Sequence, residues 1–128
     1  MPPKAVFDTS AILALIRAEP GWDRAAAALP GAVLCAVNAA EVYSKLADWQ
    51  MPPHEQARYH TVIEDIVVPL DNDLALRAGA FRRSTKAYGL SIADRACLAL
   101  AQRLGVRAVT ADKIWTKVEV GVEIEVIR

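Results

Sequence analysis

The chain has 128 residues, the usual length of one domain, and we expect residues 1–128 to form a single unit. Its hydrophobic content of 54% predicts either extensive burial or an apolar surface that a partner covers. The formal net charge of zero excludes a global basic field, so any contact with nucleic acid must depend on a local patch. No apolar run approaches the roughly 18 residues of a membrane span, and no signal peptide is evident. We therefore expect a cytoplasmic protein without a membrane partner.

Short apolar runs alternate with helical patterns along the chain. The first run ends at Asp8, Asn38 is expected to cap the helix after the second run, and Ser91 is expected to cap a later helix. In chain order the expected elements are a strand at 5–7, a helix from 9 to the Pro20-Gly21 stop, a helix at 22–29, a strand at 32–37, helices at 38–50 and 54–65, a strand at 66–68, helices at 71–87 and 91–103, a strand at 106–110, a short helical turn at 113–116 and a strand at 122–127.

This alternation of helices with fully apolar strands predicts an α/β fold. Parallel strands buried on both faces read as continuous apolar runs, and right-handed crossovers place helices on the two sides of the sheet. In such sheets ligands bind beyond the carboxyl ends of the strands, near the point where the strand order reverses. Residues that follow directly after the strands are therefore the candidates for a functional site.

Four acids follow strands or begin helices, in the contexts V-F-D-T-S, N-A-A-E-V, S-I-A-D-R and V-T-A-D-K: Asp8, Glu41, Asp94 and Asp112. Each of them also has a structural explanation when it is taken singly. Asn38-x-x-Glu41 and Ser91-x-x-Asp94 have the spacing of capping boxes, and the other two acids can cap the helical turns that follow them. Acids near helix N-termini also gain about 0.3–1 kcal/mol from the helix dipole.

The four acids together predict a metal site. Their neighbours are apolar or small, and a like-charge pair ~4 Å apart costs about 4 kcal/mol at an effective dielectric near 20. A set of carboxylate oxygens is what Mg²⁺ or Mn²⁺ prefers, and such an ion stabilises a phosphoryl transition state and activates water. Three hydroxyl side chains beside the acids are candidates for orienting a carboxylate or a ligand water: Thr9, Ser10 and Thr110.

Other polar residues are placed outside this set. His54 and His60 share a polar helix and should face solvent, so they offer no zinc site. Asp71 begins a polar helical segment and is expected to act as its cap. Three basic residues could touch phosphates, although a solvated helix face explains them as well: Lys45, Arg82 and Lys86.

The chain resembles PIN-domain ribonucleases, specifically the VapC-type toxins of type II toxin–antitoxin pairs. The matching stretches are V-F-D-T-S-A-I-L-A-L, A-V-N-A-A-E-V-Y-S-K-L, G-L-S-I-A-D-R-A-C-L-A-L-A and A-V-T-A-D-K-I-W, which occur in the family's order across nearly the whole chain. The resemblance implies a three-layer α/β/α sandwich with a mainly parallel sheet of four to five strands. It also implies Mg²⁺- or Mn²⁺-dependent cleavage of single-stranded RNA.

By motif, the resemblance makes Asp8, Glu41, Asp94 and Asp112 the metal-binding and catalytic acids, with Thr110 as a supporting hydroxyl. Asp8 and Asp94 would be the most direct ligands, and the other two would complete the site or act through water. Lys113 follows Asp112 where some relatives carry further acids, which leaves open whether one or two ions bind. The family further implies a homodimer that a small antitoxin neutralises by inserting into the active-site groove.

Other classes remain open at this point. A receiver-like signalling domain also gathers acids at strand ends. It requires adjacent acids after its first strand and a lysine after its last strand, and neither feature is found in this sequence. A phosphatase with a nucleophilic Asp8 would usually carry a second acid at the position of Ser10. A protein that only binds a partner would account for the apolar content but not for the acids.

Overall fold

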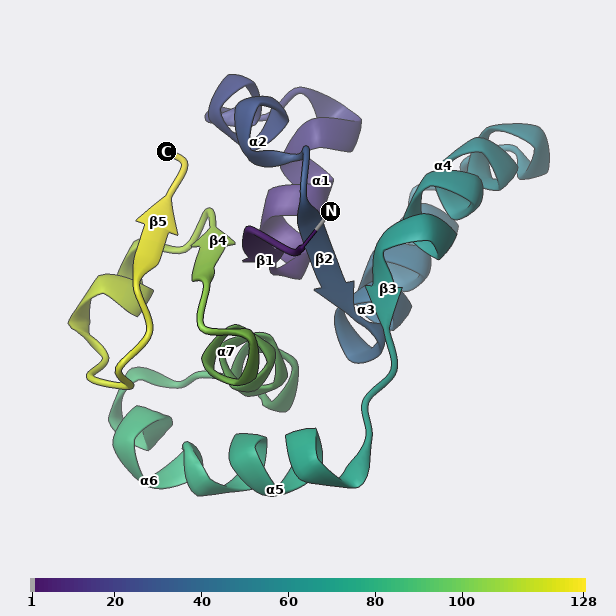
Figure 1. The fold of residues 1–128 in the computed structure, drawn as a ribbon. Helices are drawn as coiled ribbons and strands as arrows, with labels where there is room; N and C mark the ends of the chain where they lie inside the picture. The colour runs from purple at the N-terminus through teal and green to yellow at the C-terminus, as the bar shows by residue number, and fades with distance from the viewer. Residues whose placement is uncertain (1) are drawn as a thin grey trace.

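A computed structural model describes residues 2–128. Helices and strands alternate through most of the chain (Figure 1). In chain order they are β1 (Ala5–Phe7), α1 (Thr9–Arg17), α2 (Trp22–Ala28), β2 (Ala32–Cys35), α3 (Ala36–Asp48), α4 (Pro53–Ile66), β3 (Val67–Val68), α5 (Asn72–Ala80), α6 (Arg82–Thr85), the 3₁₀ helix η1 (Lys86–Tyr88), α7 (Ile92–Leu104), β4 (Arg107–Thr110), the 3₁₀ helix η2 (Lys113–Lys117) and β5 (Ile124–Val126).

The five strands form one parallel sheet in the order β3-β2-β1-β4-β5. From β1 the chain adds β2 and then β3 on one side, and it returns to add β4 and then β5 on the other side. The strand order therefore reverses between β1 and β4, where the carboxyl ends of adjacent strands leave room for a ligand. The backbone N–H of Asp8 donates to the carbonyl of Val109 at 3.0 Å, so the end of β1 stays joined to β4.

Helices cover both faces of the sheet. Alternate strand residues point to opposite faces, so Ala5 and Phe7 pack with α1 to α4, whereas Val6 packs with α5 and α7. In Figure 1, α1 and α2 lie above the sheet and α5, α6 and α7 lie below it, while α4 projects to one side. This arrangement confirms the predicted three-layer α/β/α sandwich with a parallel central sheet. Within residues 2–128, no helix is long and apolar enough to cross a membrane.

Three predicted boundaries were wrong. The strand predicted at 32–37 ends at Cys35, and α3 begins at Ala36 rather than at an Asn38 cap. The strand predicted at 122–127 is confined to residues 124–126. The helix predicted at 71–87 is broken after residue 80.

The break in that helix has a local cause. The hydroxyl of Thr85 donates to the carbonyl of Phe81 at 2.8 Å, and that of Ser84 approaches the same carbonyl at 3.3 Å. Side-chain hydroxyls that bind nearby carbonyls compete with regular helical geometry, and Gly79 weakens the preceding turn. Three short helical segments, α5, α6 and η1, therefore replace one long helix.

Candidate active site

Asp8 lies at the reversal of strand order, directly after β1, and is 3% exposed. Its carboxylate caps α1 by accepting from the backbone N–H of Ala11 at 2.9 Å. The hydroxyl of Ser10 lies 2.7 and 2.9 Å from the two carboxylate oxygens, and that of Thr110 donates to Oδ2 at 2.6 Å. The predicted cap is confirmed, and three donors fix the orientation of this buried acid.

The same hydroxyls join the ends of β1 and β4. Thr110 is the last residue of β4 and is completely buried. Its Oγ1 lies 3.3 Å from Oγ of Ser10 and accepts from the backbone N–H of Asp112 at 3.1 Å, while Oγ of Ser10 accepts from the N–H of Ala111 at 2.8 Å. Two of the predicted supporting hydroxyls therefore hold the loop that carries Asp112 against Asp8.

Glu41 stands on α3, where its side chain is reached by α1. The hydroxyl of Thr9 donates to Oε1 of Glu41 at 2.6 Å. The predicted capping box between Asn38 and Glu41 is wrong, because Asn38 lies inside α3 and its side chain binds Thr9 instead. Glu41 is exposed and remains free to face a ligand.

Asp94 and Asp112 begin helical segments, as predicted. Ser91 and Asp94 form a full capping box at the start of α7, with bonds of 2.9 and 3.1 Å. Asp112 caps η2 by accepting from the N–H of Ile114 at 3.0 Å. Each carboxylate still has an oxygen that these caps do not occupy.

The pKa values of two of the acids respond to the charges of other acids in the set. Burial, with a smaller contribution from the charge of Asp94, raises the pKa of Asp8 from 3.8 to about 6 against the three hydrogen bonds that lower it. Burial also raises the pKa of Asp94, and the charges of Glu41 and Asp112 raise it further. Repulsion of this kind is relieved when a cation binds between the carboxylates.

No basic side chain neutralises these acids. None of the four forms an ion pair within the part of the chain that the structure describes. Arg95, beside Asp94, donates to the backbone carbonyl of Ala78 at 3.1 Å. A buried carboxylate without a cationic partner is unusual, and here the charge of a second acid, Asp94, also acts on it.

The donor set fits a hard divalent cation in its chemistry, but it does not form a closed cage. Among residues 2–128, no three His, Cys, Asp or Glu side chains are placed to hold one metal ion together. Mg²⁺ usually keeps several waters and binds through one or two carboxylates, so a sparse oxygen site suits it. The buried, unneutralised Asp8 is the observation that favours a cation here.

The remaining predicted residues lie away from this network. Lys45 is exposed on α3 one turn beyond Glu41, and Arg82 and Lys86 are exposed on α6 and η1. His54 and His60 are exposed, as predicted. No contact between the three basic residues and the acids is recorded in the described residues.

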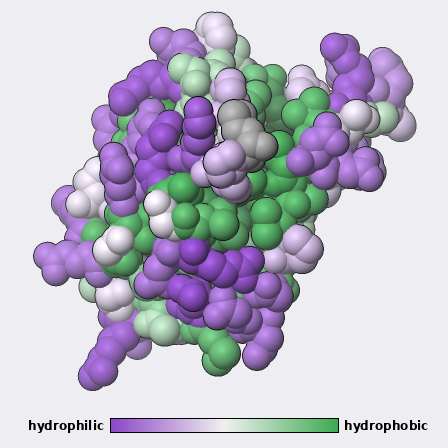
Figure 2. Space-filling model, in the orientation of Figure 1, coloured by the Kyte–Doolittle hydropathy of each residue, from purple (hydrophilic) through white to green (hydrophobic). Residues whose placement is uncertain are grey.

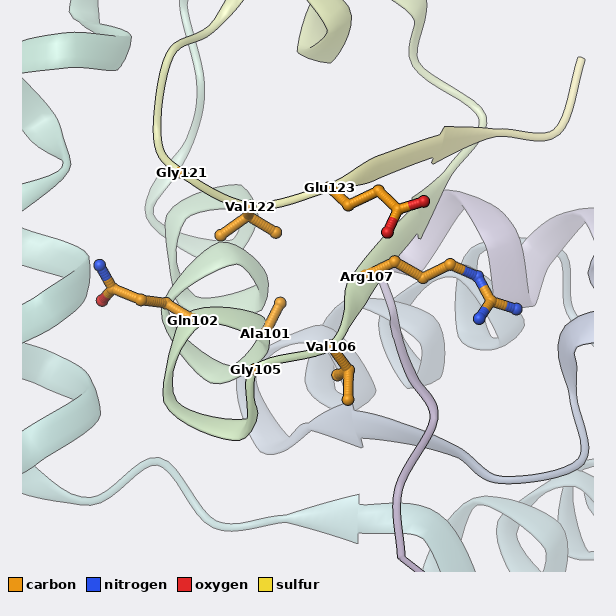
Figure 3. A pocket seen from close by; sticks show the side chains of 8 residues that line it. All are labelled: Ala101, Gln102, Gly105, Val106, Arg107, Gly121, Val122 and Glu123. Atoms are coloured by element: carbon orange, nitrogen blue, oxygen red, sulfur yellow. The ribbon is translucent and has the colours of Figure 1, made fainter.

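A separate cavity of about 200 Å³ lies at the edge of the sheet opposite to the one that carries the acids (Figure 3). It is lined by residues at the amino ends of β4 and β5, including Arg107 and Glu123, and by Gly105 at the end of α7. Since the four acids follow the carboxyl ends of the strands, this cavity is not part of their site.

Fold and site together define a PIN domain. The PIN domain family matches residues 5–121, so the chain belongs to this family, as the sequence motifs predicted. The match covers all four acids and argues against the receiver-like alternative. No curated protein matches the sequence.

Solved structures share this fold at low sequence identity. A chain of a toxin–antitoxin complex from Klebsiella pneumoniae is 20% identical with a TM-score of 0.74, and the match covers 98% of each chain. VapBC2 from Rickettsia felis, bound to a DNA fragment from its promoter, gives 12% identity and a TM-score of 0.74 over 94% of this chain and 96% of that one. VapBC-5 from Mycobacterium tuberculosis gives 21% identity and a TM-score of 0.63 over 98% and 99%.

Proposed function

We propose that this protein is a VapC-type toxin, a Mg²⁺- or Mn²⁺-dependent endoribonuclease that cuts single-stranded regions of RNA. The observation that carries the proposal is the buried carboxylate of Asp8. It lies at the reversal of strand order, and its pKa is raised to about 6. The charge of Asp94 acts on Asp8, and the charges of Glu41 and Asp112 act on Asp94. Residues 1–128 would act as one nuclease unit in the cytoplasm.

Asp8 and Asp94 are the proposed direct ligands of the cation, with Glu41 and Asp112 completing the site directly or through water. A bound Mg²⁺ or Mn²⁺ would lower the pKa of a water and stabilise charge on the scissile phosphate. Hydrolysis of the phosphodiester bond is expected to leave a 5′-phosphate and a 3′-hydroxyl.

The chain's own polar groups prepare these ligands. Ser10 and Thr110 orient Asp8, and Thr9 orients Glu41. The N-termini of α1 and α7, at which Asp8 and Asp94 stand, favour a bound phosphate. Lys45, Arg82 and Lys86 are the proposed contacts with the RNA backbone.

The proposed protein partners are a small antitoxin and a second copy of the chain. An apolar cleft of about 170 Å³ lies between α1 and α4, lined among others by Leu15, Tyr59 and Val62, and Val62 is 52% exposed. In Figure 2, apolar surface extends from the region of α1 and α2 toward the hydrophilic end of α4. Open apolar surface of this kind suits a protein partner, and several of the similar structures are toxin–antitoxin complexes.

The proposal is tested by comparing the wild-type chain with Asp94→Asn. Expression of the wild type alone should slow bacterial growth, and the purified protein should cut single-stranded RNA with Mg²⁺ or Mn²⁺ but not with EDTA. Asp94→Asn keeps the cap of α7 in shape and should lose both effects. Equal growth of the two strains together with no metal-dependent cleavage by the wild type would contradict the proposal.

A further inference from the structure

Asn38 is a buried polar side chain that is not one of the four acids and does not form the capping box predicted for it. It lies in the first turn of α3 and has no exposed surface. Its amide nitrogen donates to Oγ1 of Thr9 at 3.2 Å and to the backbone carbonyl of Ala93 at 3.3 Å. Its side-chain oxygen has no hydrogen-bond partner among the described residues.

The hydrogen-bond chain through Asn38 has a single direction. The carbonyl of Ala93 can only accept, so the nitrogen of the Asn38 amide must face it. Thr9 accepts the second amide proton, and its own hydroxyl proton then goes to Oε1 of Glu41 at 2.6 Å. The approach of the Thr9 hydroxyl to the backbone carbonyl of Asn38, at 3.4 Å, is much longer than this bond.

The amide thereby joins three elements that carry acids. Thr9 belongs to α1, directly after Asp8, and Ala93 belongs to α7, directly before Asp94. Glu41, at the end of the hydrogen-bond chain, stands on the same helix as Asn38. A shift of the amide would therefore disturb both the direction of the Glu41 carboxylate and the distance from α3 to the start of α7.

Packing alone does not explain an amide at this position. A buried polar atom without a partner is unfavourable, and leucine has nearly the same shape without that atom. Because the carbonyl of Ala93 lies within α7, it keeps a helical partner when the amide is removed. Leucine at this position would therefore preserve the stability of the fold, but it could not hold the Glu41 carboxylate in its orientation through Thr9.

We propose that Asn38 is a positioning residue that sets the geometry of the metal-binding acids through Thr9 and Ala93. This inference rests on the proposed function, since it assigns a task to the same site. Groups that orient metal ligands typically contribute 10–100-fold to metal affinity or activity. Asn38 acts through Glu41 and the start of α7 and does not itself touch the cation.

The test measures Mn²⁺ affinity by calorimetry together with the melting temperature of the metal-free protein. Asn38→Leu should weaken Mn²⁺ binding by about 10-fold or more while the melting temperature changes by only about 3 °C or less. Thr9→Val breaks the next link at a partly exposed position and should weaken binding to a similar degree. Ser44→Ala removes a hydroxyl on the same helix that binds only the carbonyl of Ala40, and it should leave both quantities unchanged.

The double variant gives the sharpest result. If Asn38 acts through Thr9, Thr9→Val combined with Asn38→Leu should weaken binding less than the product of the two single effects. Wild-type affinity in both single variants would overturn the inference while leaving the proposed function intact. If Asn38→Leu does not fold, the result for Thr9→Val decides. A wild-type protein that binds no Mn²⁺ would overturn the proposed function and this inference together.

Discussion

Asp8 and Asp71 occupy the same local structure and have opposite surroundings. Each caps a helix from an extended backbone, with φ and ψ of −90° and 177° at Asp8 and −88° and 177° at Asp71. Each accepts from the N–H three residues later at 2.9 Å. Asp8 is buried beside other acids, whereas Asp71 is exposed and pairs with Arg103 at 2.8 Å.

The pKa values of the two acids move in opposite directions for this reason. Burial raises that of Asp8 to about 6, whereas the backbone hydrogen bond from Leu74 and the bond from Arg103 lower that of Asp71. Cap geometry is thus common to a structural acid and a candidate ligand. What separates them is burial and the presence of a basic partner, and both depend on the tertiary fold.

The largest expected effect is on catalysis. Asp8→Asn should reduce metal-dependent RNA cleavage by more than about 100-fold, because a proposed direct ligand loses its charge. Asp71→Asn is the matched control: it keeps a good cap, loses one surface ion pair, and should cleave at the wild-type rate. Rates of cleavage of a labelled RNA check both, and equal losses in the two variants would show that Asp8 and Asp71 do not differ in function.

The second effect is on the pH dependence of stability without metal. Since the pKa of Asp8 rises from 3.8 unfolded to about 6 folded, the native state binds the extra proton between these values, and stability falls as pH rises through them. Asp8 alone should lower the free energy of unfolding by about 3 kcal/mol across that window. Urea unfolding of the wild type and Asp8→Asn at several pH values should show this difference, which would be absent if Asp8 were solvated.

The same comparison predicts the opposite sign at Asp71. Its lowered pKa means that its stabilising contribution is present at neutral pH and fades as pH falls through its folded pKa. In the same urea titrations, Asp71→Asn should therefore lose stability near neutral pH but not in acid. If Asp71→Asn were instead more stable than the wild type near neutral pH, the ionised carboxylate of Asp71 would be unfavourable in the folded state, as that of Asp8 is.

The smallest effect concerns the basic residues. Lys45→Ala should raise the KM for RNA a few-fold and flatten its salt dependence, with kcat unchanged, because one proposed phosphate contact is lost. Lys4→Ala, at an exposed position before β1, provides the control for a loss of charge alone. An unchanged KM in Lys45→Ala would assign Lys45 to the solvated surface.

The local positions of three of the acids followed from the sequence. Asp8 and Asp112 lie one and two residues after apolar strands, and Asp94 lies three residues after the serine cap of α7, so local pattern determines these junctions. Glu41 came from its motif, but its supposed partner Asn38 was assigned to the wrong role. The spacing Asn38-x-x-Glu41 is compatible with a capping box and with a buried amide that bridges helices. Only the packing of α1 and α7 against α3 distinguishes the two roles.

The broken helix after residue 80 was missed for a related reason. The bonds from Ser84 and Thr85 to the carbonyl of Phe81 are local, but whether these hydroxyls face solvent or fold back depends on the burial of Phe81 and Thr85. The sequence predicted that the four acids would meet, whereas among residues 2–128 no three acidic, histidine or cysteine side chains are placed to hold one ion together. Distances between side chains on four separate elements depend on how the helices pack, which a sequence pattern does not specify.

We propose that the four acids, and not the capping acids elsewhere, hold a divalent cation. Anomalous diffraction from a crystal soaked in Mn²⁺ would locate such an ion. We predict a peak about 2.1 Å from the carboxylate of Asp8, shared with Asp94 either directly or through water. A crystal that shows no peak at Asp8, or a peak at Asp71 instead, would contradict the proposed cation site.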